Sequence, residues 1–197
     1  LTKTFPNVKV RDQGPRGSCV GQQYYATFTY AWLQGGGAYH MFSATFIYGL
    51  INNGVDRGAY TGDSLKAGKQ YGICLESEVP EGVIYSRDFP QSAYKTAERF
   101  KNFEAYWTPD FQDIASALML GHPCGFGIEI GQRFEPDADG VIPDLQGRLG
   151  GHDMCGVGLK KVRGAWHLKV QNSWSTNWGK RGFCYLPESY FPGNGEG

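Results

Sequence analysis

The sequence predicts an α+β fold, with helices in its first half and an antiparallel sheet or barrel in its second half. Up to about residue 100, apolar residues recur at helical spacing over long stretches. Beyond that point the apolar runs are short and bounded by Gly and Pro, as in strands. The 29 glycines and the 15% aromatic content also favour a turn-rich fold with substantial β structure. A chain of 197 residues can bury its own core without a disulfide or metal.

The first half should contain three helices. Residues 5–18 are rich in Pro and Gly and are expected to be extended. Ser18 is then placed to cap a helix that begins near Cys19 and continues to about Leu33, before three successive glycines. Two further helical stretches follow, over 43–50 and 61–71, the latter stopping at Gly72.

The second half should contain one helix and several strands. The helix is expected around 111–120, and the strands over 125–130, 154–159, 165–170 and 182–186. We find no internal repeat and no low-complexity linker. The sequence therefore predicts a single domain over 1–197, with a helical lobe at about 8–100 and a β lobe at about 101–190.

Composition argues against several kinds of partner. The 19 basic and 19 acidic residues cancel and no basic run occurs, which disfavours nucleic acid or an anionic membrane surface. No apolar stretch approaches the ~18 residues of a membrane span. The first residues do not have the shape of a signal peptide. The location stays open between a cytoplasmic protein and a processed mature form.

The five cysteines are odd in number, so at least one thiol is free or paired between chains. Three of them, Cys124, Cys155 and Cys184, have apolar or small neighbours and should be buried thiols that act as small hydrophobes. A Cys₃His metal site is the alternative, but no C-x₂₋₄-C spacing supports it. We therefore expect neither a metal site nor a cofactor.

Cys19 is the candidate nucleophile. It follows the segment Gln13-Gly-Pro-Arg-Gly-Ser and lies in the first turn of a predicted helix, where the macrodipole favours a thiolate. That effect is worth only about 0.3–1 kcal/mol, less than one pKa unit. A nearby imidazolium is also needed. The alternative is a structural cysteine at the junction of loop and helix.

Two later segments supply partners for a thiol. The first reads Gly-Gly-His152-Asp, and the second reads Asn172-Ser-Trp174-Ser-Thr-Asn-Trp178-Gly. A single histidine that enters a strand is often structural. An amide among tryptophans is costly unless hydrogen-bonded, however, and orienting an imidazole would satisfy it. His152 would then be the base, Asn172 its orienting partner and Trp174 an apolar lid.

The remaining histidines fit this chemistry poorly. His40 follows a glycine run, His122 lies in a Gly-His-Pro turn, and His167 lies in the strand that precedes Asn172. We interpret all three as solvent-facing or structural. Asp153 is the carboxylate next to the base, but strand alternation should point it to the opposite face.

These segments, in this order, resemble the papain-like cysteine peptidases. His152 lies 133 residues after Cys19 and Asn172 lies 153 after it, close to the family's separation of about 130–150. Cys19 matches the nucleophile, His152 the base, Gln13 the oxyanion-hole glutamine, and the Asn172–Trp178 segment the family's asparagine–tryptophan block. The resemblance covers nearly the whole chain and implies a two-lobed papain-like fold.

The chain departs from the family signature at three positions. Arg16 stands where the signature has a cysteine, and Val20 where it has an aromatic residue. A disulfide common in secreted members is therefore not expected. Ser175 stands where Gly is usual after the tryptophan. The segment around Cys19 instead resembles a mostly prokaryotic and viral branch of the family.

The resemblance implies a cysteine endopeptidase that hydrolyses a protein or peptide substrate through a thioester acyl-enzyme, and it allows for an inhibitory propeptide. Two alternatives stay open: acyl transfer to an amine on the same scaffold, and a catalytically silent homologue that binds peptides. The substrate-binding residues that the resemblance implies are Gly58, Tyr60, Gly127, Gly151, Asp153 and Trp174. The natural substrate is not identified.

Overall fold

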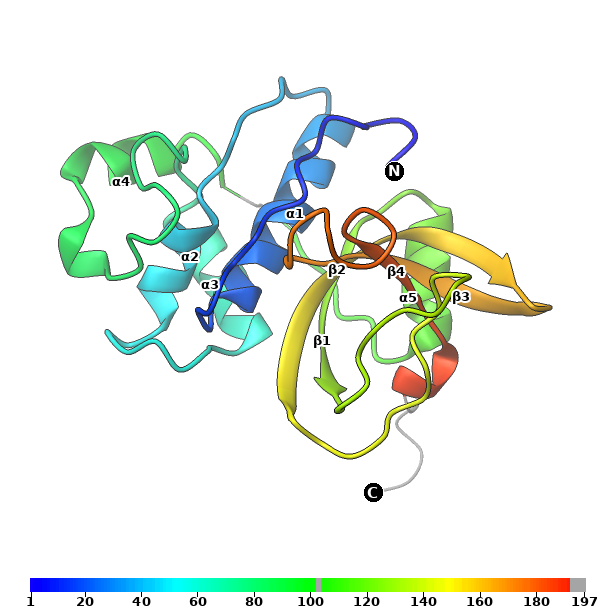
Figure 1. The fold of residues 1–197 in the computed structure, drawn as a ribbon. Helices are drawn as coiled ribbons and strands as arrows, with labels where there is room; N and C mark the ends of the chain where they lie inside the picture. Colours follow the sequence, from blue (N-terminus) through cyan, green and yellow to red (C-terminus); the bar gives the residue numbers. More distant parts are fainter. Residues whose placement is uncertain (102–103, 192–197) are drawn as a thin grey trace. The chain divides into compact units, whose positions relative to one another are not determined.

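The computed structural model describes residues 1–101 and 104–191. Its helices are α1 (Cys19–Gln34), α2 (Ala44–Ile51), α3 (Thr61–Gln70), α4 (Gln91–Ala97) and α5 (Phe111–Met119), with short 3₁₀ turns at Ser86–Asp88 and Glu188–Tyr190. The strands are β1 (Cys124–Ile130), β2 (Gly150–Val162), β3 (Ala165–Gln171) and β4 (Phe183–Leu186). The predicted α+β class is confirmed (Figure 1).

The chain divides into two compact units. The helical unit comprises Gln13–Tyr106, and the sheet unit comprises Leu1–Asp12 together with the chain from Trp107 onward. The helical lobe was predicted to begin at about residue 8, whereas residues 8–12 belong to the sheet unit. The N-terminal segment joins the sheet through hydrogen bonds from the Leu1 ammonium group to the Val157 carbonyl and from the Gln171 amide to the Lys9 carbonyl.

Helix α1 begins where the sequence predicts, but Ser18 does not cap it. Ser18 occupies the N-cap position with φ −87° and ψ 13°, and its side chain accepts no capping hydrogen bond. Ser43, the N-cap of α2, has an extended ψ of 108° and accepts a 3.0 Å bond from the N–H of Phe46. The contrast gives the reason, because an N-cap side chain reaches the first turn only from an extended backbone.

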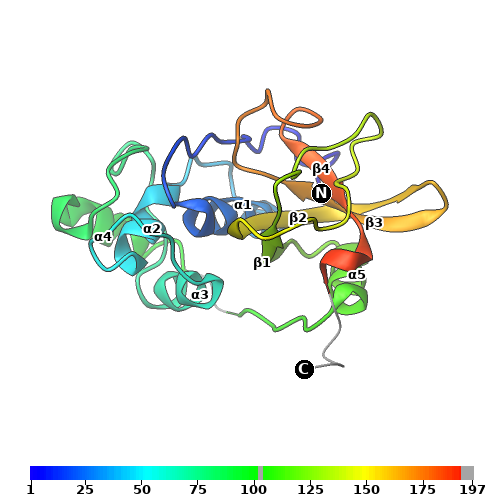
Figure 2. The same ribbon diagram turned by 60° about the horizontal axis from the view of Figure 1, so that its bottom comes forward.

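Helix α2 lies against α1 and α3 in the helical unit (Figure 2). The approach to α1 is close at Gly21, where a Cβ atom would lie 2.3 Å from the Ala44 carbonyl oxygen. Helix α4 was not predicted from the sequence. This helix has only seven residues and buries only Ala93 and Ala97, so it carries little periodic signal.

The four strands form one antiparallel sheet in the order β1-β2-β3-β4. Arg163 and Gly164, both with positive φ, form the tight turn between β2 and β3. Strand β2 starts at Gly150, four residues before the predicted start, and therefore includes His152. The glycine pair is followed by two polar residues, His152 and Asp153, so no apolar run marks that start in the sequence.

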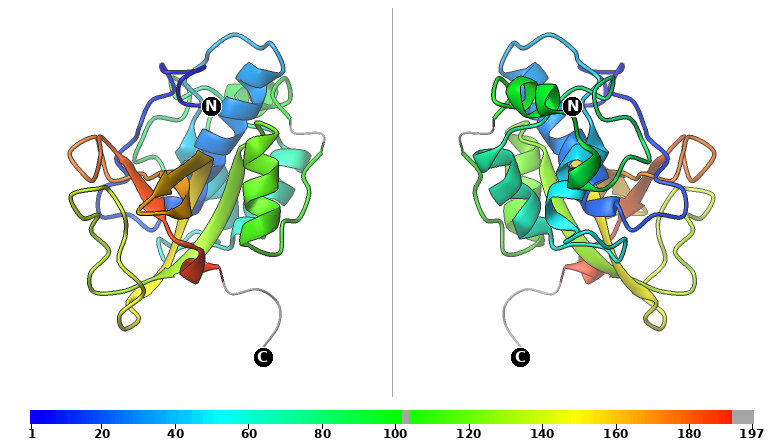
Figure 3. Two further views of the ribbon diagram at one scale, coloured as in Figure 1. Left: turned by 90° about the vertical axis from the view of Figure 1, so that its right-hand side faces the viewer. Right: turned by 90° about the vertical axis from the view of Figure 1, so that its left-hand side faces the viewer.

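The barrel alternative is wrong. Within residues 1–101 and 104–191 the sheet is open, with β1 and β4 as its edge strands, and Tyr185 of β4 forms an isolated parallel bridge with Val141. Four strands are too few to curl into a closed barrel. Helix α5 instead packs on β1 and β2 and covers one face of the sheet (Figure 3). The core of this unit joins Phe111 and Leu118 of α5 to strand residues such as Phe126, Met154 and Leu168. None of the described helices is long and apolar enough to cross a membrane.

Candidate active site

His152 and Asn172 are joined by a buried hydrogen bond in the sheet unit. His152 lies in β2 and Asn172 directly follows β3, and the His152 Nε2 to Asn172 Oδ1 distance is 2.7 Å. The two side chains are 3% and 2% exposed. The paired strands therefore bring together two residues that lie far apart in the sequence.

The backbone around Asn172 fixes the direction of this hydrogen bond. The N–H of Ser173 donates to Asn172 Oδ1 at 2.7 Å, so the atom at that position must be an acceptor and hence the oxygen. His152 Nε2 must then carry the hydrogen and donate it. A neutral imidazole with its proton on Nε2 has Nδ1 as its acceptor. Asn172 thus selects the tautomer in which Nδ1 is the basic atom.

Three aromatic residues form a cluster on the imidazole of this pair. The indole of Trp174 stacks on the His152 imidazole, with ring centroids 4.6 Å apart and an interplanar angle of 25°. Phe134 packs edge-on against both His152 and Trp174, and Trp178 stacks on Phe134. Trp174 was predicted as the lid. Phe134 was not, because a single Phe in a loop between strands carries no periodic or motif signal.

Burial lowers the pKa of His152 below its ordinary value, and the hydrogen bond to Asn172 opposes that shift. Desolvation is the larger of the two causes, because an imidazolium among aromatic rings loses its hydration. In the absence of a counter-charge, the site therefore favours the neutral base. An anionic partner would be needed to hold the protonated form.

Cys19 and Gln13 lie in the helical unit at the start of α1. Cys19 is the first residue of the helix and is partly exposed. Gln13 is 8% exposed, and its Nε2 donates a 2.8 Å hydrogen bond to the Arg16 carbonyl oxygen. This bond orients the Gln13 amide within the turn that leads to Cys19. The predicted nucleophile and the predicted oxyanion donor thus share one loop.

The predicted substrate-binding residues are dispersed. In the helical unit, Tyr60 is 82% exposed at the N-cap of α3, and Gly58 has a φ of 86°. In the sheet unit, Gly127 on β1 faces Asp153 in the β1–β2 register, and a Cβ atom on Gly151 would meet no atom within 4 Å. Asp153 is only 8% exposed, since β2 is buried on both faces from His152 to Val157.

The other cysteines and histidines have structural surroundings. All five cysteines, which lie in the described part of the chain, are thiols rather than disulfides, and every one except Cys19 is buried. Burial raises the pKa of Cys74 to about 12 and that of Cys124 to about 11. His167 is buried with Nδ1 3.0 Å from the Ala165 carbonyl oxygen. Among the described residues, no group of three His, Cys, Asp or Glu side chains could hold a metal ion.

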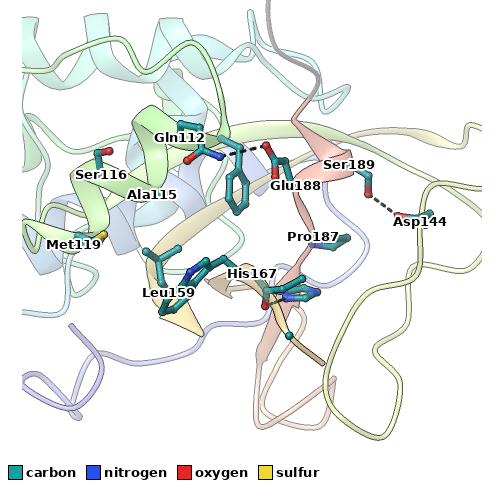
Figure 4. Close-up of a pocket in the computed structure, with 14 residues that line it drawn as sticks. Gln112, Ala115, Ser116, Met119, Asp144, Leu159, His167, Pro187, Glu188 and Ser189 are labelled. Carbon is teal, nitrogen blue, oxygen red and sulfur yellow. Dashed lines mark hydrogen bonds between the residues drawn. The ribbon is translucent and has the colours of Figure 1, made fainter. Parts of the chain in front are cut away.

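A separate cavity of about 620 Å³ lies in the sheet unit between α5, the β2–β3 hairpin and the 3₁₀ turn at Glu188–Tyr190 (Figure 4). Its carboxylates already have partners, since Glu188 accepts from Gln112 and Asp144 accepts from Ser189. The lining includes His167 but no cysteine. This cavity therefore lacks the groups needed for the chemistry predicted from the sequence.

The chain is similar in sequence to known proteins along most of its length. The family model described as papain family cysteine protease matches residues 5–190. An uncharacterized peptidase C1-like protein of Acanthamoeba polyphaga mimivirus is 27% identical over 202 residues, which is 91% of this chain and 64% of the relative. The chain thus spans less than two thirds of that relative's length.

Solved structures show the same fold. Xylellain, a cysteine protease from Xylella fastidiosa, superposes with a TM-score of 0.81 at 26% identity, covering 94% of this chain and 78% of its own. Digestive procathepsin L 3 of Tenebrio molitor gives a TM-score of 0.72 at 19% identity, covering 96% of this chain and 64% of its own. The bacterial and viral relatives agree with the branch indicated by the segment around Cys19.

Proposed function

Because the chain belongs to the papain family of cysteine proteases, we propose that it cleaves peptide bonds with Cys19 as nucleophile and His152 as base. The observation that carries this proposal is the hydrogen bond from His152 Nε2 to Asn172 Oδ1. It places the imidazole proton on Nε2, and Nδ1 is therefore the atom that accepts the thiol proton.

The proposed reaction has two stages. Cys19 gives its proton to His152 Nδ1, and the thiolate attacks the scissile carbonyl carbon. As the C–N bond breaks, the imidazolium returns that proton to the leaving amine, and a thioester remains on Cys19. Water then attacks the thioester, with His152 accepting a proton from it. The acid product leaves and the thiol is regenerated.

We assign oxyanion stabilisation to the Gln13 side-chain amide and the Cys19 backbone N–H. The first N–H groups of a helix point out of its N-terminus, and Cys19 is the first residue of α1. The hydrogen bond from Gln13 to the Arg16 carbonyl holds the amide in position before substrate arrives. Donors fixed in advance stabilise a charge that develops only in the transition state.

The substrate class that we propose is an extended protein or peptide cut at an internal bond. We further propose that an inhibitory propeptide is a partner of this domain, by analogy with the proform structure of the Tenebrio protein. No cofactor or metal enters the proposed reaction.

An internally quenched peptide with blocked ends tests the endopeptidase proposal. Wild type should cleave it, Cys19→Ser should not, and the control variant Cys124→Ala should retain cleavage. Acid quenching during turnover should trap the acyl group on Cys19, as seen by mass spectrometry of the peptide that contains it. Cleavage by Cys19→Ser would refute the nucleophile assignment. An amide product that dominates when an amine is added would show acyl transfer, and a wild type that neither cleaves the peptide nor forms a thioester would show a silent homologue.

A further inference from the structure

Asp56 bonds directly to the loop that carries Cys19. Its Oδ1 accepts hydrogen bonds from the Gly17 N–H at 2.9 Å and from the Tyr48 hydroxyl at 2.6 Å. Its Oδ2 lies 4.0 Å from Nη1 of Arg16. One carboxylate thus contacts two residues of the 13–19 loop and one residue of α2.

Tyr48 extends this network to the predicted substrate-binding residue Gly58. The Gly58 N–H donates to the Tyr48 oxygen at 3.2 Å, and the Tyr48 hydroxyl in turn donates to Asp56. Backbone N–H groups only donate, so the directions of all these bonds are fixed. Burial and the bond to Asp56 raise the pKa of Tyr48 above its ordinary value, which keeps the hydroxyl protonated.

The packing of Gly17 supports the same connection independently. A Cβ atom on Gly17 would lie 2.6 Å from the Gly58 nitrogen and 3.2 Å from the Tyr48 hydroxyl oxygen. Real Cβ atoms do not approach backbone that closely, so only glycine fits here. The backbone before Cys19 therefore lies directly on the Gly58 segment, and Asp56 bonds to the amide at that contact.

We propose that Asp56 is a positioning residue that holds the 13–19 loop, and with it Cys19 and Gln13, in the form needed for attack. The inference rests on the proposed function, which makes Cys19 the nucleophile and Gln13 the oxyanion donor. Arg16 stands where the family signature has a cysteine, and its carbonyl accepts the bond from Gln13. Polar contacts from Asp56 thus fix the segment without a covalent link.

The two bonds to Oδ1 contribute more than the ion pair. The Arg16 side chain is 40% exposed and its distance from Asp56 is at the limit of an ion pair, so solvent screens the attraction. Gly17 and Tyr48, by contrast, form short bonds to an ionised acceptor. Asp56→Asn keeps Oδ1 and removes the charge, whereas Asp56→Ala removes both bonds. The two variants therefore separate positioning from net charge.

The test measures kcat, KM and amide exchange in matched variants. We expect Asp56→Ala to lower kcat about 10- to 100-fold, because a misplaced nucleophile loses the geometry of attack. Asp56→Asn should lower kcat less than Asp56→Ala does, and Arg16→Gln should lower kcat less than about fivefold. Tyr48→Phe removes the acceptor for Gly58 and should raise KM more than it lowers kcat. Glu78→Ala is the control, since it also removes a carboxylate that accepts a side-chain bond, from Thr96, within the helical unit.

Hydrogen exchange of the Gly17 amide makes the test independent of catalysis. Asp56→Ala should expose that amide to exchange, and Glu78→Ala should leave its protection unchanged. If Asp56→Ala matches Glu78→Ala in both kcat and Gly17 exchange, the inference is overturned. If Asp56→Ala does not fold, the variants Asp56→Asn and Tyr48→Phe test the inference in its place. The inference is overturned if both variants keep the wild-type kcat, the wild-type KM and the wild-type protection of the Gly17 amide.

The proposed function can fail without affecting this result. An inactive wild type would refute peptide cleavage, while loss of Gly17 protection in Asp56→Ala would still establish the contact that holds the loop. Activity that survives Cys19→Ser would refute the nucleophile and, with it, the catalytic part of this inference.

Discussion

The imidazole of His152 stacks on the indole of Trp174, with ring centroids 4.6 Å apart and an angle of 25° between the ring planes. The contact covers the ring that bonds to Asn172 and excludes water from that bond. Phe134 and Trp178 support the indole from its edge and keep the cover in place. Trp174 therefore influences both the strength of the His152–Asn172 bond and the protonation of the base.

Removing this cover should raise the pKa of His152. Burial favours the neutral imidazole and lowers its pKa, so Trp174→Ala should return the value toward the ordinary 6.5. NMR titration in a Cys19→Ser background measures the shift without the thiol partner. The His152 pKa in Trp174→Phe should lie between the values for wild type and Trp174→Ala. Trp166→Ala, which replaces an exposed tryptophan on β3, should leave the His152 pKa unchanged. A His152 pKa that stays unchanged in Trp174→Ala would show that this ring does not cause the desolvation.

Cys19 should be the one cysteine that reacts at low pH. The thiols of Cys74, Cys124 and Cys184 have raised pKa values because they are buried, and a protonated, buried thiol is inert. Limiting iodoacetamide at pH 6, followed by peptide mapping, should find Cys19 alkylated first, with loss of activity in proportion. If another cysteine is labelled first and activity is retained, Cys19 is not the nucleophile.

Gln13→Ala should lower kcat with little change in KM. An oxyanion donor acts on charge that exists only in the transition state, and losing one costs roughly 10²–10³ in rate. Gln23→Ala serves as the control, since it removes a buried glutamine whose amide bonds only within α1, to Thr27. If Gln13→Ala has a raised KM and a normal kcat, Gln13 supports the structure of the loop and does not stabilise the oxyanion of the transition state.

The pocket for the second substrate residue before the cut should accept large side chains. The resemblance assigns Gly127 and Gly151 to its wall, and the space at the Gly151 Cβ position is open. Gly151→Val should therefore fold normally and shift preference toward small residues. Asp153→Asn should change any preference for Arg or Lys only slightly, because the Asp153 side chain is 8% exposed and presents little of its carboxylate to a bound substrate. Positional-scanning libraries on both variants would measure this, and a wild-type preference for Ala or Val would contradict it.

Long apolar patterns and the spacing of the three motif segments predicted most of this structure. Helix α1 begins at Cys19 as expected, because its apolar stripe and the glycines after it leave little alternative. Helix α4 and the start of β2 were missed, since short or glycine-rich segments take their structure from tertiary contacts. The sequence left an open sheet and a barrel as alternatives, because strand patterns do not reveal whether the ends of a sheet meet.

The backbone conformation at Ser175 could be expected from the family resemblance but not from the local sequence pattern. This residue stands where glycine is usual, and its φ is 64°, a left-handed conformation that glycine adopts without strain. Its hydroxyl accepts a bond from the Asn177 N–H. Asp56 and Phe134 carried no comparable signal, because each acts through neighbours that are distant in the sequence.

The pH dependence of Cys19 alkylation, compared between wild type and His152→Ala, tests the central claim most directly. If His152 and Cys19 form a thiolate–imidazolium pair, the wild-type rate should persist well below the ordinary thiol pKa of about 8.5. In His152→Ala the low-pH reactivity should disappear, leaving a single limb that rises near that value. Two superimposable profiles would show that His152 is not the base for Cys19.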